Sequence, residues 1–239
     1  MPEVIINGAE GRLEGRYSPA KGERRPIVLL LHPHPQHGGT MHNKVIYALN
    51  QVFMRQGFST LRFNFRGVGR SQGGFGRGEG ELTDAASALD WLQAYNPNAG
   101  QCWIAGFSFG AWIGMQLLMR RPEIDRFISV APPANIYDFG FLAPCPSSGL
   151  ILQGDKDETV PEDSVKKLAE KLSKQRDIEI DYRIIKGANH FFSERMDKLE
   201  AAVEDYVQTA MAPPPPAKPA AKPEGREKSH KEKEKTAAK

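Results

Sequence analysis

Ser108 is the centre of a short pattern, Gly106-Phe107-Ser108-Phe109-Gly110, that could carry nucleophilic chemistry. A serine at the tip of a strand-to-helix turn lies on strained backbone, and side chains at the two glycine positions would clash there. Gly106 and Gly110 remove those side chains. The backbone N–H of Phe109 and the start of the helix would then meet negative charge that develops beside Ser108. The pattern therefore predicts a nucleophilic serine, provided that a base and an acid follow it.

Candidates for the base and the acid follow Ser108 along the chain. Serine catalysis needs a base that takes the hydroxyl proton and an acid that holds the base in the right tautomer. The strand expected at 150–153 is followed by Asp155 and Asp157, and the strand expected at 178–185 is followed by His190. The order Ser, Asp, His is the order that an α/β-hydrolase sheet requires. These residues predict a triad in which either aspartate could be the acid.

The elements that must position these residues alternate between strand and helix after an opening hairpin. Apolar runs and alternation predict strands at 4–7, 12–17, 26–31, 58–65, 101–105, 127–130, 150–153 and 178–185. Apolar residues at helical spacing predict helices at 43–57, 82–92, 111–119, 161–172 and 193–207. The segment 32–39 has two prolines and two glycines, so no helix is expected there. This alternation predicts an α/β fold with a mainly parallel sheet and no internal repeat.

The chain resembles the α/β-hydrolases over about residues 4–211. Within them it is similar to a small branch of dienelactone-hydrolase-like proteins and bacterial esterases. The matching segments are LHPHP at 31–35, FRGVGRS at 65–71, GFSFG at 106–110, GDKDETVP at 154–161 and GANHFF at 187–192. The resemblance implies the α/β-hydrolase fold, with helices on both faces of the sheet. It also places the acid three residues after the glycine of G-x-x-D-x-x-V-P, which selects Asp157 beside Ser108 and His190.

The resemblance further implies an oxyanion donor in the loop after the first central strand. Many relatives have His-Gly there, but this chain has His32-Pro33, and proline has no N–H to donate. We therefore expect the donors to be the backbone N–H groups of His34 and Phe109. Dienelactone hydrolases proper use a cysteine nucleophile, so Ser108 is a departure from their pattern.

The segment 132–148 bears on the substrate, because lid domains usually enter this fold after the strand at 127–130. It is too short for a domain, so we expect no cap and an open site for small or short-chain carboxylic esters. The candidates for its apolar wall are Phe107, Phe109, Trp112, Tyr137, Phe139 and Phe141. Core packing is the alternative for Phe107 and Trp112. The same triad could serve a thioesterase or a peptidase. A non-catalytic interaction module is a further alternative, against which a complete triad argues.

Other polar residues have plainer explanations than ligand binding. Four histidines lie close together, His32, His34, His37 and His42, but their spacing fits no common metal-ligand pattern. The glycines of 66–80 do not form G-x-G-x-x-G before a helix, which argues against a nucleotide. Ion pairs that anchor this loop are the expected role of Arg66, Arg70, Glu79, Glu81 and Asp84, and Asp155 is expected to stabilise its own loop. We predict neither a metal nor a cofactor.

Composition and charge limit the remaining functions. The 239 residues are 40% hydrophobic, which suffices for one core, and their net charge is +3. From Ala212 onward eight Lys and Arg and four Glu give +4, which leaves −1 for the body. We therefore expect no nucleic-acid partner for the body. Residues 1–211 are predicted to fold as one domain. Residues 212–239, rich in Pro, Ala, Lys and Glu, are predicted to be disordered.

Cysteine use and hydropathy suggest the compartment. The two cysteines cannot form a disulfide framework; Cys102 is expected to be buried and Cys145 to be a partly exposed bystander. No basic leader with an apolar run begins the chain, and no stretch approaches eighteen apolar residues. We predict a cytoplasmic protein with a small-molecule ester as its partner and no membrane contact. A homo-oligomer is left open.

Overall fold

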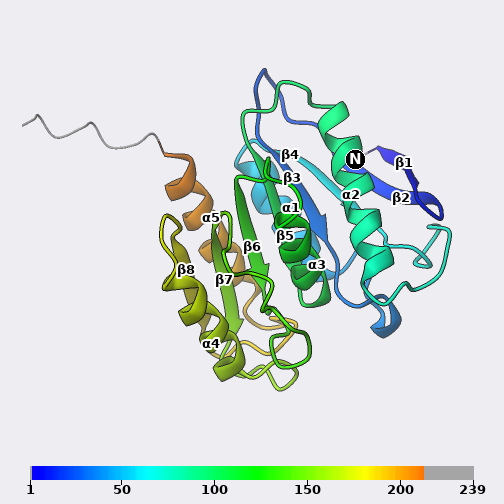
Figure 1. The fold of residues 1–239 in the computed structure, drawn as a ribbon. Coiled ribbons are helices and arrows are strands. Elements are labelled where there is room, and N and C mark those ends of the chain that lie inside the picture. The colour runs from blue at the N-terminus through cyan, green and yellow to red at the C-terminus, as the bar shows by residue number, and fades with distance from the viewer. Residues whose placement is uncertain (1, 213–239) are drawn as a thin grey trace, which may run out of the picture.

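A twisted sheet of eight strands with five α-helices around it forms residues 2–212, the part of the chain that the computed structural model describes (Figure 1). The predicted tail 212–239 lies outside the described residues except for Ala212. In chain order the elements are β1 (Glu3–Gly8), β2 (Gly11–Ser18), β3 (Ile27–Leu31), the 3₁₀ turn η1 (Pro35–His37), α1 (Lys44–Arg55), β4 (Ser59–Phe63), α2 (Glu79–Ala94), β5 (Cys102–Phe107), α3 (Phe109–Leu118), β6 (Arg126–Val130), β7 (Ser148–Gly154), α4 (Glu162–Ser173), β8 (Ile180–Ile185) and α5 (Met196–Met211).

The strands lie in the order β1-β2-β4-β3-β5-β6-β7-β8. β2 runs antiparallel to both β1 and β4, and every later pair is parallel. Parallel strands end at one edge of a sheet, so the loops after β3, β5, β6, β7 and β8 gather there (Figure 1). The predicted α/β fold with a mainly parallel sheet is confirmed.

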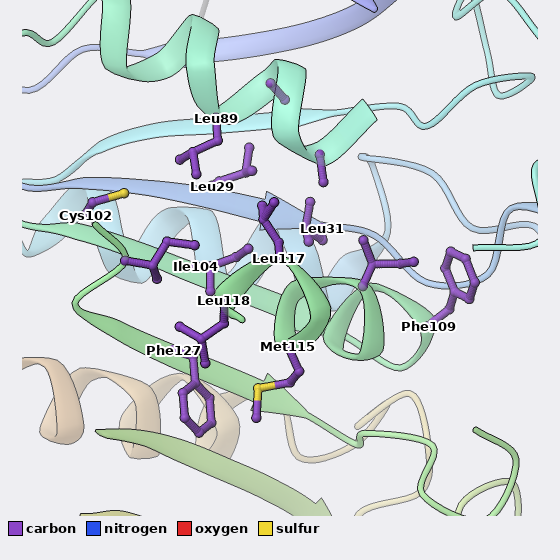
Figure 2. Close-up of a cluster of buried hydrophobic side chains, with 14 of the residues drawn as sticks. Leu29, Leu31, Leu89, Cys102, Ile104, Phe109, Met115, Leu117, Leu118 and Phe127 are labelled. Carbon is purple, nitrogen blue, oxygen red and sulfur yellow. The ribbon is translucent and has the colours of Figure 1, made fainter. Parts of the chain in front are cut away.

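Two hydrophobic cores, one on each face, hold the helices to the sheet. α2, α3 and α4 contribute to one core, and α1 and α5 contribute to the other. Figure 2 shows the first core, where Leu89 of α2 and Leu117 of α3 pack with Leu29, Leu31 and Ile104 of β3 and β5. Burial of each such side chain contributes about 1.5–3 kcal/mol. Because helices cover both faces, the central strands β3 and β5 are continuously apolar.

Two predicted boundaries differ from the structure near the loops of interest. The segment predicted to lack helix contains the single 3₁₀ turn Pro35–His37, which tolerates proline at its first position. The last helix begins at Met196 rather than 193 and continues to Met211. Its start is delayed because the Asn189 carboxamide accepts the N–H of Ser193 at 3.1 Å and holds a turn there.

Cys145 is buried, which corrects the prediction of a partly exposed side chain. It is 4% exposed, because the Gln175 carboxamide accepts its N–H at 2.6 Å and donates to the Leu142 carbonyl at 2.7 Å, which draws this loop onto the body. Burial raises the pKa of the Cys145 thiol. Cys102 is buried as predicted, and burial raises its pKa to about 12. Both cysteines are free thiols of low reactivity.

Candidate active site

Ser108 lies at the turn between β5 and α3 with positive φ, at φ 53° and ψ −118°. A non-glycine residue in such a conformation costs about 1–3 kcal/mol. A Cβ atom at Gly106 would lie 2.3 Å from the Gly110 carbonyl oxygen, and one at Gly110 would lie 2.1 Å from the Leu31 oxygen. The Ser108 N–H donates to the Val130 carbonyl at 2.8 Å and ties the turn to β6. Both glycines are therefore required by close backbone approach.

His190 lies between Ser108 and Asp157 and contacts both of them. Its Nδ1 is 2.8 Å from Asp157 Oδ2, and its Nε2 is 3.1 Å from Ser108 Oγ. The side chain of Asp157 is fully buried and that of His190 is 8% exposed. The three residues come from the ends of β5, β7 and β8, which the parallel topology brings to one edge. This is the arrangement in which a carboxylate orients an imidazole toward a hydroxyl.

Four donors surround the Asp157 carboxylate. Oδ1 accepts the backbone N–H groups of Thr159 at 2.9 Å and Val160 at 2.8 Å. Oδ2 accepts from His190 Nδ1 and from Gln153 Nε2, the latter at 3.1 Å. A carboxylate with this many donors is fixed in orientation. Gln153 was not among the residues predicted for the site; the available signal was a polar residue directly after three aliphatic residues of a buried strand.

Asp155 lies apart from His190, although both aspartates follow β7. Its carboxylate accepts the N–H of Gly187 at 2.6 Å and so joins the loop after β7 to the loop after β8. This is the loop-stabilising contact that was expected of it. Asp157, which the resemblance selects, is the aspartate that reaches the imidazole.

The backbone N–H groups of His34 and Phe109 are available at this edge. Neither donates to another group among residues 2–212. Their rings pack with centroids 4.9 Å apart, so the loop after β3 lies against the start of α3. The carbonyl of His34 accepts the N–H groups of His37 and Gly39, which fixes the turn. Two such donors beside a nucleophilic serine could hold an oxyanion.

His32 is fully buried and holds the start of the same loop. Its Nδ1 lies 2.7 Å from the Pro33 carbonyl, and its Nε2 accepts the N–H of Phe65 at 3.0 Å. Burial lowers its pKa to about 4, so the ring is neutral at physiological pH. Desolvation also lowers the pKa of His34, whose Nδ1 accepts the N–H of Gln36. In the described part of the chain, no three His, Cys, Asp or Glu side chains gather as a metal site would require.

The charged residues near the glycine-rich loop form internal ion pairs. The guanidinium of Arg66 is 4% exposed and contacts Asp84 at 2.7 Å, and hydrogen bonding to Asp84 raises its pKa. Glu81 accepts the N–H groups of Gly76 and Gly78. Arg70 pairs with Glu14 and with Glu3, and Glu79 lies exposed at the start of α2. These contacts fit the expected anchoring role of Arg66, Arg70, Glu81 and Asp84.

A pocket of about 440 Å³ opens beside Ser108. Of the six aromatic residues proposed for its wall, only Phe109 and Tyr137 line it among the described residues. Phe107 is fully buried, Trp112 stacks behind Tyr137 at 4.2 Å, and Phe139 and Phe141 lie elsewhere in the loop after β6. The full lining is Pro33, His34, His37, Gly38, Gly39, Asn43, Ser108, Phe109, Pro133, Ile136, Tyr137, Thr159, His190 and Phe191.

Ile136 and Phe191 are lining residues that sequence reasoning missed. They are 60% and 54% exposed, among the most exposed large apolar side chains of residues 2–212. The available signal was a large apolar residue in a loop at the edge of the sheet where Ser108 lies, one of them directly after His190. No Asp, Glu, Lys or Arg from the described chain lines the pocket, and burial raises the pKa of the Tyr137 phenol, so it stays neutral. The pocket therefore suits a neutral group.

Comparisons with known proteins identify the family and the fold of the chain. The family model of the X-Pro dipeptidyl-peptidases (S15 family) matches residues 16–215. The chain is similar to a protein of unknown function from Agrobacterium tumefaciens, described as a candidate α/β hydrolase. That likeness has 60% identity and TM-score 0.85, and covers 87% of this chain and 96% of the other.

Two further solved structures are described as serine hydrolases. One is an α/β serine hydrolase homologue from Coxiella burnetii, with 37% identity, TM-score 0.79 and coverage of 86% and 96%. The other is an α/β serine hydrolase without a lid from Xanthomonas campestris, with 30% identity, TM-score 0.81 and coverage of 90% and 96%. The loop between β6 and β7 carries no helix or strand in this chain either, which agrees with the expected lack of a cap.

In residues 2–212, each helix is too short or too polar to cross a bilayer.

Proposed function

The chain belongs to the X-Pro dipeptidyl-peptidase (S15) family and is an α/β serine hydrolase, and we propose that it cleaves small or short-chain carboxylic esters through an acyl-enzyme on Ser108. The observation that carries the proposal is the contact of His190 with Ser108 Oγ at 3.1 Å and Asp157 at 2.8 Å, beside a pocket that no Asp, Glu, Lys or Arg of residues 2–212 lines. Ser108, His190 and Asp157 are the proposed catalytic residues.

The proposed reaction follows from the hydrogen bonds of the imidazole. With Nδ1–H donated to Asp157, Nε2 is unprotonated and accepts the Ser108 proton as Oγ bonds to the ester carbonyl carbon. The carbonyl oxygen becomes an oxyanion, for which the N–H groups of His34 and Phe109 are the proposed donors. The proton passes to the leaving alkoxide as the ester bond breaks. Water then attacks the acyl-enzyme by the same route and releases the acid and Ser108.

The family also raises the possibility of peptidase activity, which the pocket disfavours. A dipeptidyl-peptidase releases dipeptides from an amino terminus, so its substrate brings an ammonium group close to the serine. Moving an ammonium group from water into an apolar site is costly unless a carboxylate pairs with it. The pocket of about 440 Å³ has no carboxylate from residues 2–212 in its lining. This supports neutral acyl groups, in esters or thioesters, over peptide amino termini.

The experiment compares three substrates on the wild-type protein and Ser108→Ala. We expect hydrolysis of p-nitrophenyl butyrate and the matching butyryl thioester, and little release from Gly-Pro-p-nitroanilide. Ser108→Ala should lose esterase activity by several orders of magnitude while its melting temperature stays near that of the wild type. Covalent labelling by a fluorophosphonate should disappear with it. Preferred cleavage of the anilide would favour the peptidase, and neither turnover nor labelling would favour a non-catalytic module.

Two further proposals concern the surroundings of the protein. We propose a cytoplasmic location, supported by two free and buried thiols, as is usual in a reducing compartment. We propose a small-molecule ester as partner, supported by a pocket that lacks Asp, Glu, Lys and Arg from residues 2–212 in its lining.

A further inference from the structure

Gln153 is a fully buried polar residue beside the proposed acid. It lies near the end of β7, paired with Ile184 of β8, and is 0% exposed. Its Nε2 donates to Asp157 Oδ2 at 3.1 Å and to the Val160 carbonyl at 2.7 Å. The three preceding residues of β7, Leu150, Ile151 and Leu152, are aliphatic and buried, so the glutamine is a polar exception beside them.

The orientation of the Gln153 amide is determined by its neighbours. Both close partners of Nε2 are acceptors, so the flipped amide would place its oxygen against a carboxylate and a carbonyl. In the observed orientation Oε1 is buried and has no hydrogen-bond partner within residues 2–212. An unpartnered buried carbonyl destabilises the fold, and an aliphatic side chain would avoid that cost. Packing therefore does not explain the glutamine, whereas its hydrogen bonds to Asp157 and to the Val160 carbonyl do.

We infer that Gln153 is a positioning residue, which fixes the Asp157 carboxylate and partly offsets the negative charge on Oδ2, the oxygen that faces His190. This inference rests on the proposed function. Oδ1 is held by two backbone N–H groups, and Oδ2 is shared between His190 Nδ1 and the amide. The amide thereby prevents the carboxylate from rotating away from the imidazole. Because it also donates to Oδ2, it weakens the attraction of that oxygen for a protonated imidazole.

Among the titratable side chains on the loops after β7 and β8, His190 is the one that bonds to this carboxylate in residues 2–212. On its own loop, Lys156 and Glu158 are exposed and Asp155 is bonded to the N–H of Gly187. From the loop after β8 and the start of α5, His190 faces Asp157 directly, Lys186 and Glu194 are exposed, and Arg195 donates to backbone carbonyls. Removal of the amide should therefore affect the proton affinity of the imidazole measurably.

The first variant is Gln153→Met, which has a similar length and no donor. We expect kcat to fall roughly tenfold with little change in KM, since one hydrogen bond to a charged group is lost. In the pH profile of kcat/KM, the acid limb should move to higher pH by up to about one unit, because Oδ2 then holds a protonated imidazole more strongly. Activity is expressed per active site, counted by fluorophosphonate titration, so that misfolded molecules do not contribute.

The second variant, Gln153→Glu, keeps the shape and predicts the opposite pH dependence. As a neutral acid at low pH its O–H can donate to Asp157, whereas an ionised carboxylate would repel Asp157. Its activity relative to the wild type should therefore be highest at the acid end and fall as pH rises. Gln175→Met is the matched control, because it removes a loop-anchoring amide remote from the triad. It should lower the melting temperature without moving the acid limb.

The result that would overturn the inference is a wild-type pH profile in Gln153→Met, or equal losses in both Gln153 variants at every pH. A readout without substrate separates this inference from the proposed function. The downfield proton NMR signal of His190 Nδ1–H should shift in Gln153→Met and not in Gln175→Met. If that signal shifts while the wild type hydrolyses no acyl substrate, the positioning role stands and the proposed function fails. An unchanged signal contradicts the inference even in an active esterase.

Discussion

Two histidines, His32 and His190, lie at the same edge of the sheet and differ in what their rings contact. His32 follows β3 and bonds only to backbone groups, the carbonyl of Pro33 and the N–H of Phe65. His190 follows the last strand and bonds to two side chains, the carboxylate of Asp157 and the hydroxyl of Ser108. Both rings are largely buried. Only His190 of the two lines the pocket beside Ser108.

Within one residue type, this difference separates a ring that supports the fold from a ring that serves the proposed reaction. Burial lowers the pKa of His32 to about 4, so it stays neutral and holds the turn that carries His34. His190 has a carboxylate on one side to stabilise a proton and a hydroxyl on the other to supply one. A position at the edge where the parallel strands end is therefore not enough for a catalytic role, because the hydrogen-bond partners of the ring determine what it can do.

The largest expected effect contrasts His190→Ala with His32→Ala. His190→Ala should reduce kcat/KM for p-nitrophenyl butyrate by roughly 10⁴-fold or more, since the base is gone. Its melting temperature should change little. His32→Ala should instead lower the melting temperature by several degrees, because two buried backbone groups lose their partner. A His32→Ala protein that stays folded but loses as much turnover as His190→Ala would contradict the division of roles.

The next effect is a pH-dependent loss of stability caused by His32. Its folded pKa of about 4 lies below the ordinary value of 6.5, so the unfolded chain binds a proton first as pH falls. The free energy of unfolding should therefore decrease between pH 6.5 and about 4, by roughly 3 kcal/mol from this group. Urea unfolding at intervals across this range measures it. His32→Gln, which does not titrate, should show a shallower decrease, and parallel curves for the two proteins would refute the assignment.

The fold and the positions of Ser108, Asp157 and His190 could be predicted because they depend on local pattern and topology. Apolar runs fixed the order of strands and helices, and residues directly after parallel strands must meet at one edge. The two glycines around Ser108 also have a purely local reason, since a Cβ atom there would overlap backbone. The assignment of catalytic roles to these side chains remains a proposal that the substitutions test.

Loop side chains could not be predicted in the same way, because tertiary contacts orient them. Gln175 draws the loop after β6 inward at Leu142 and Cys145, which buries a thiol that was expected to be partly exposed. The same loop directs Tyr137 and Ile136 to the pocket while Phe139 is buried elsewhere. Nothing in the local sequence distinguishes Tyr137, which lines the pocket, from Phe139, which does not.

The smallest expected effect is that of replacing Phe191, which is exposed, unlike the other phenylalanines that pack against these two histidines in residues 2–212. Phe65 packs against His32 at 4.7 Å and is fully buried, whereas Phe191 packs against His190 at 5.3 Å and is 54% exposed. Phe191→Ala should therefore leave stability almost unchanged and weaken binding of apolar acyl chains. We expect kcat/KM for p-nitrophenyl hexanoate to fall about fivefold and that for the acetate to change little, since each buried methylene contributes about 0.8 kcal/mol.

Ile5→Ala is the matched control for Phe191→Ala, because Ile5 is a similarly exposed apolar residue on β1, outside the lining of the pocket. Ile5→Ala should leave unchanged both the dependence of kcat/KM on acyl-chain length and the acid limb of the pH profile of kcat/KM. In Phe191→Ala the acid limb should also stay in place, because the ring contacts the imidazole without hydrogen bonding to it. An equal loss for acetate and hexanoate would place Phe191 with His190 in the chemistry, whereas a loss that grows with chain length places it in acyl binding. Such a graded loss would extend the contrast between the histidines to their neighbours, with Phe65 supporting the fold and Phe191 contacting substrate.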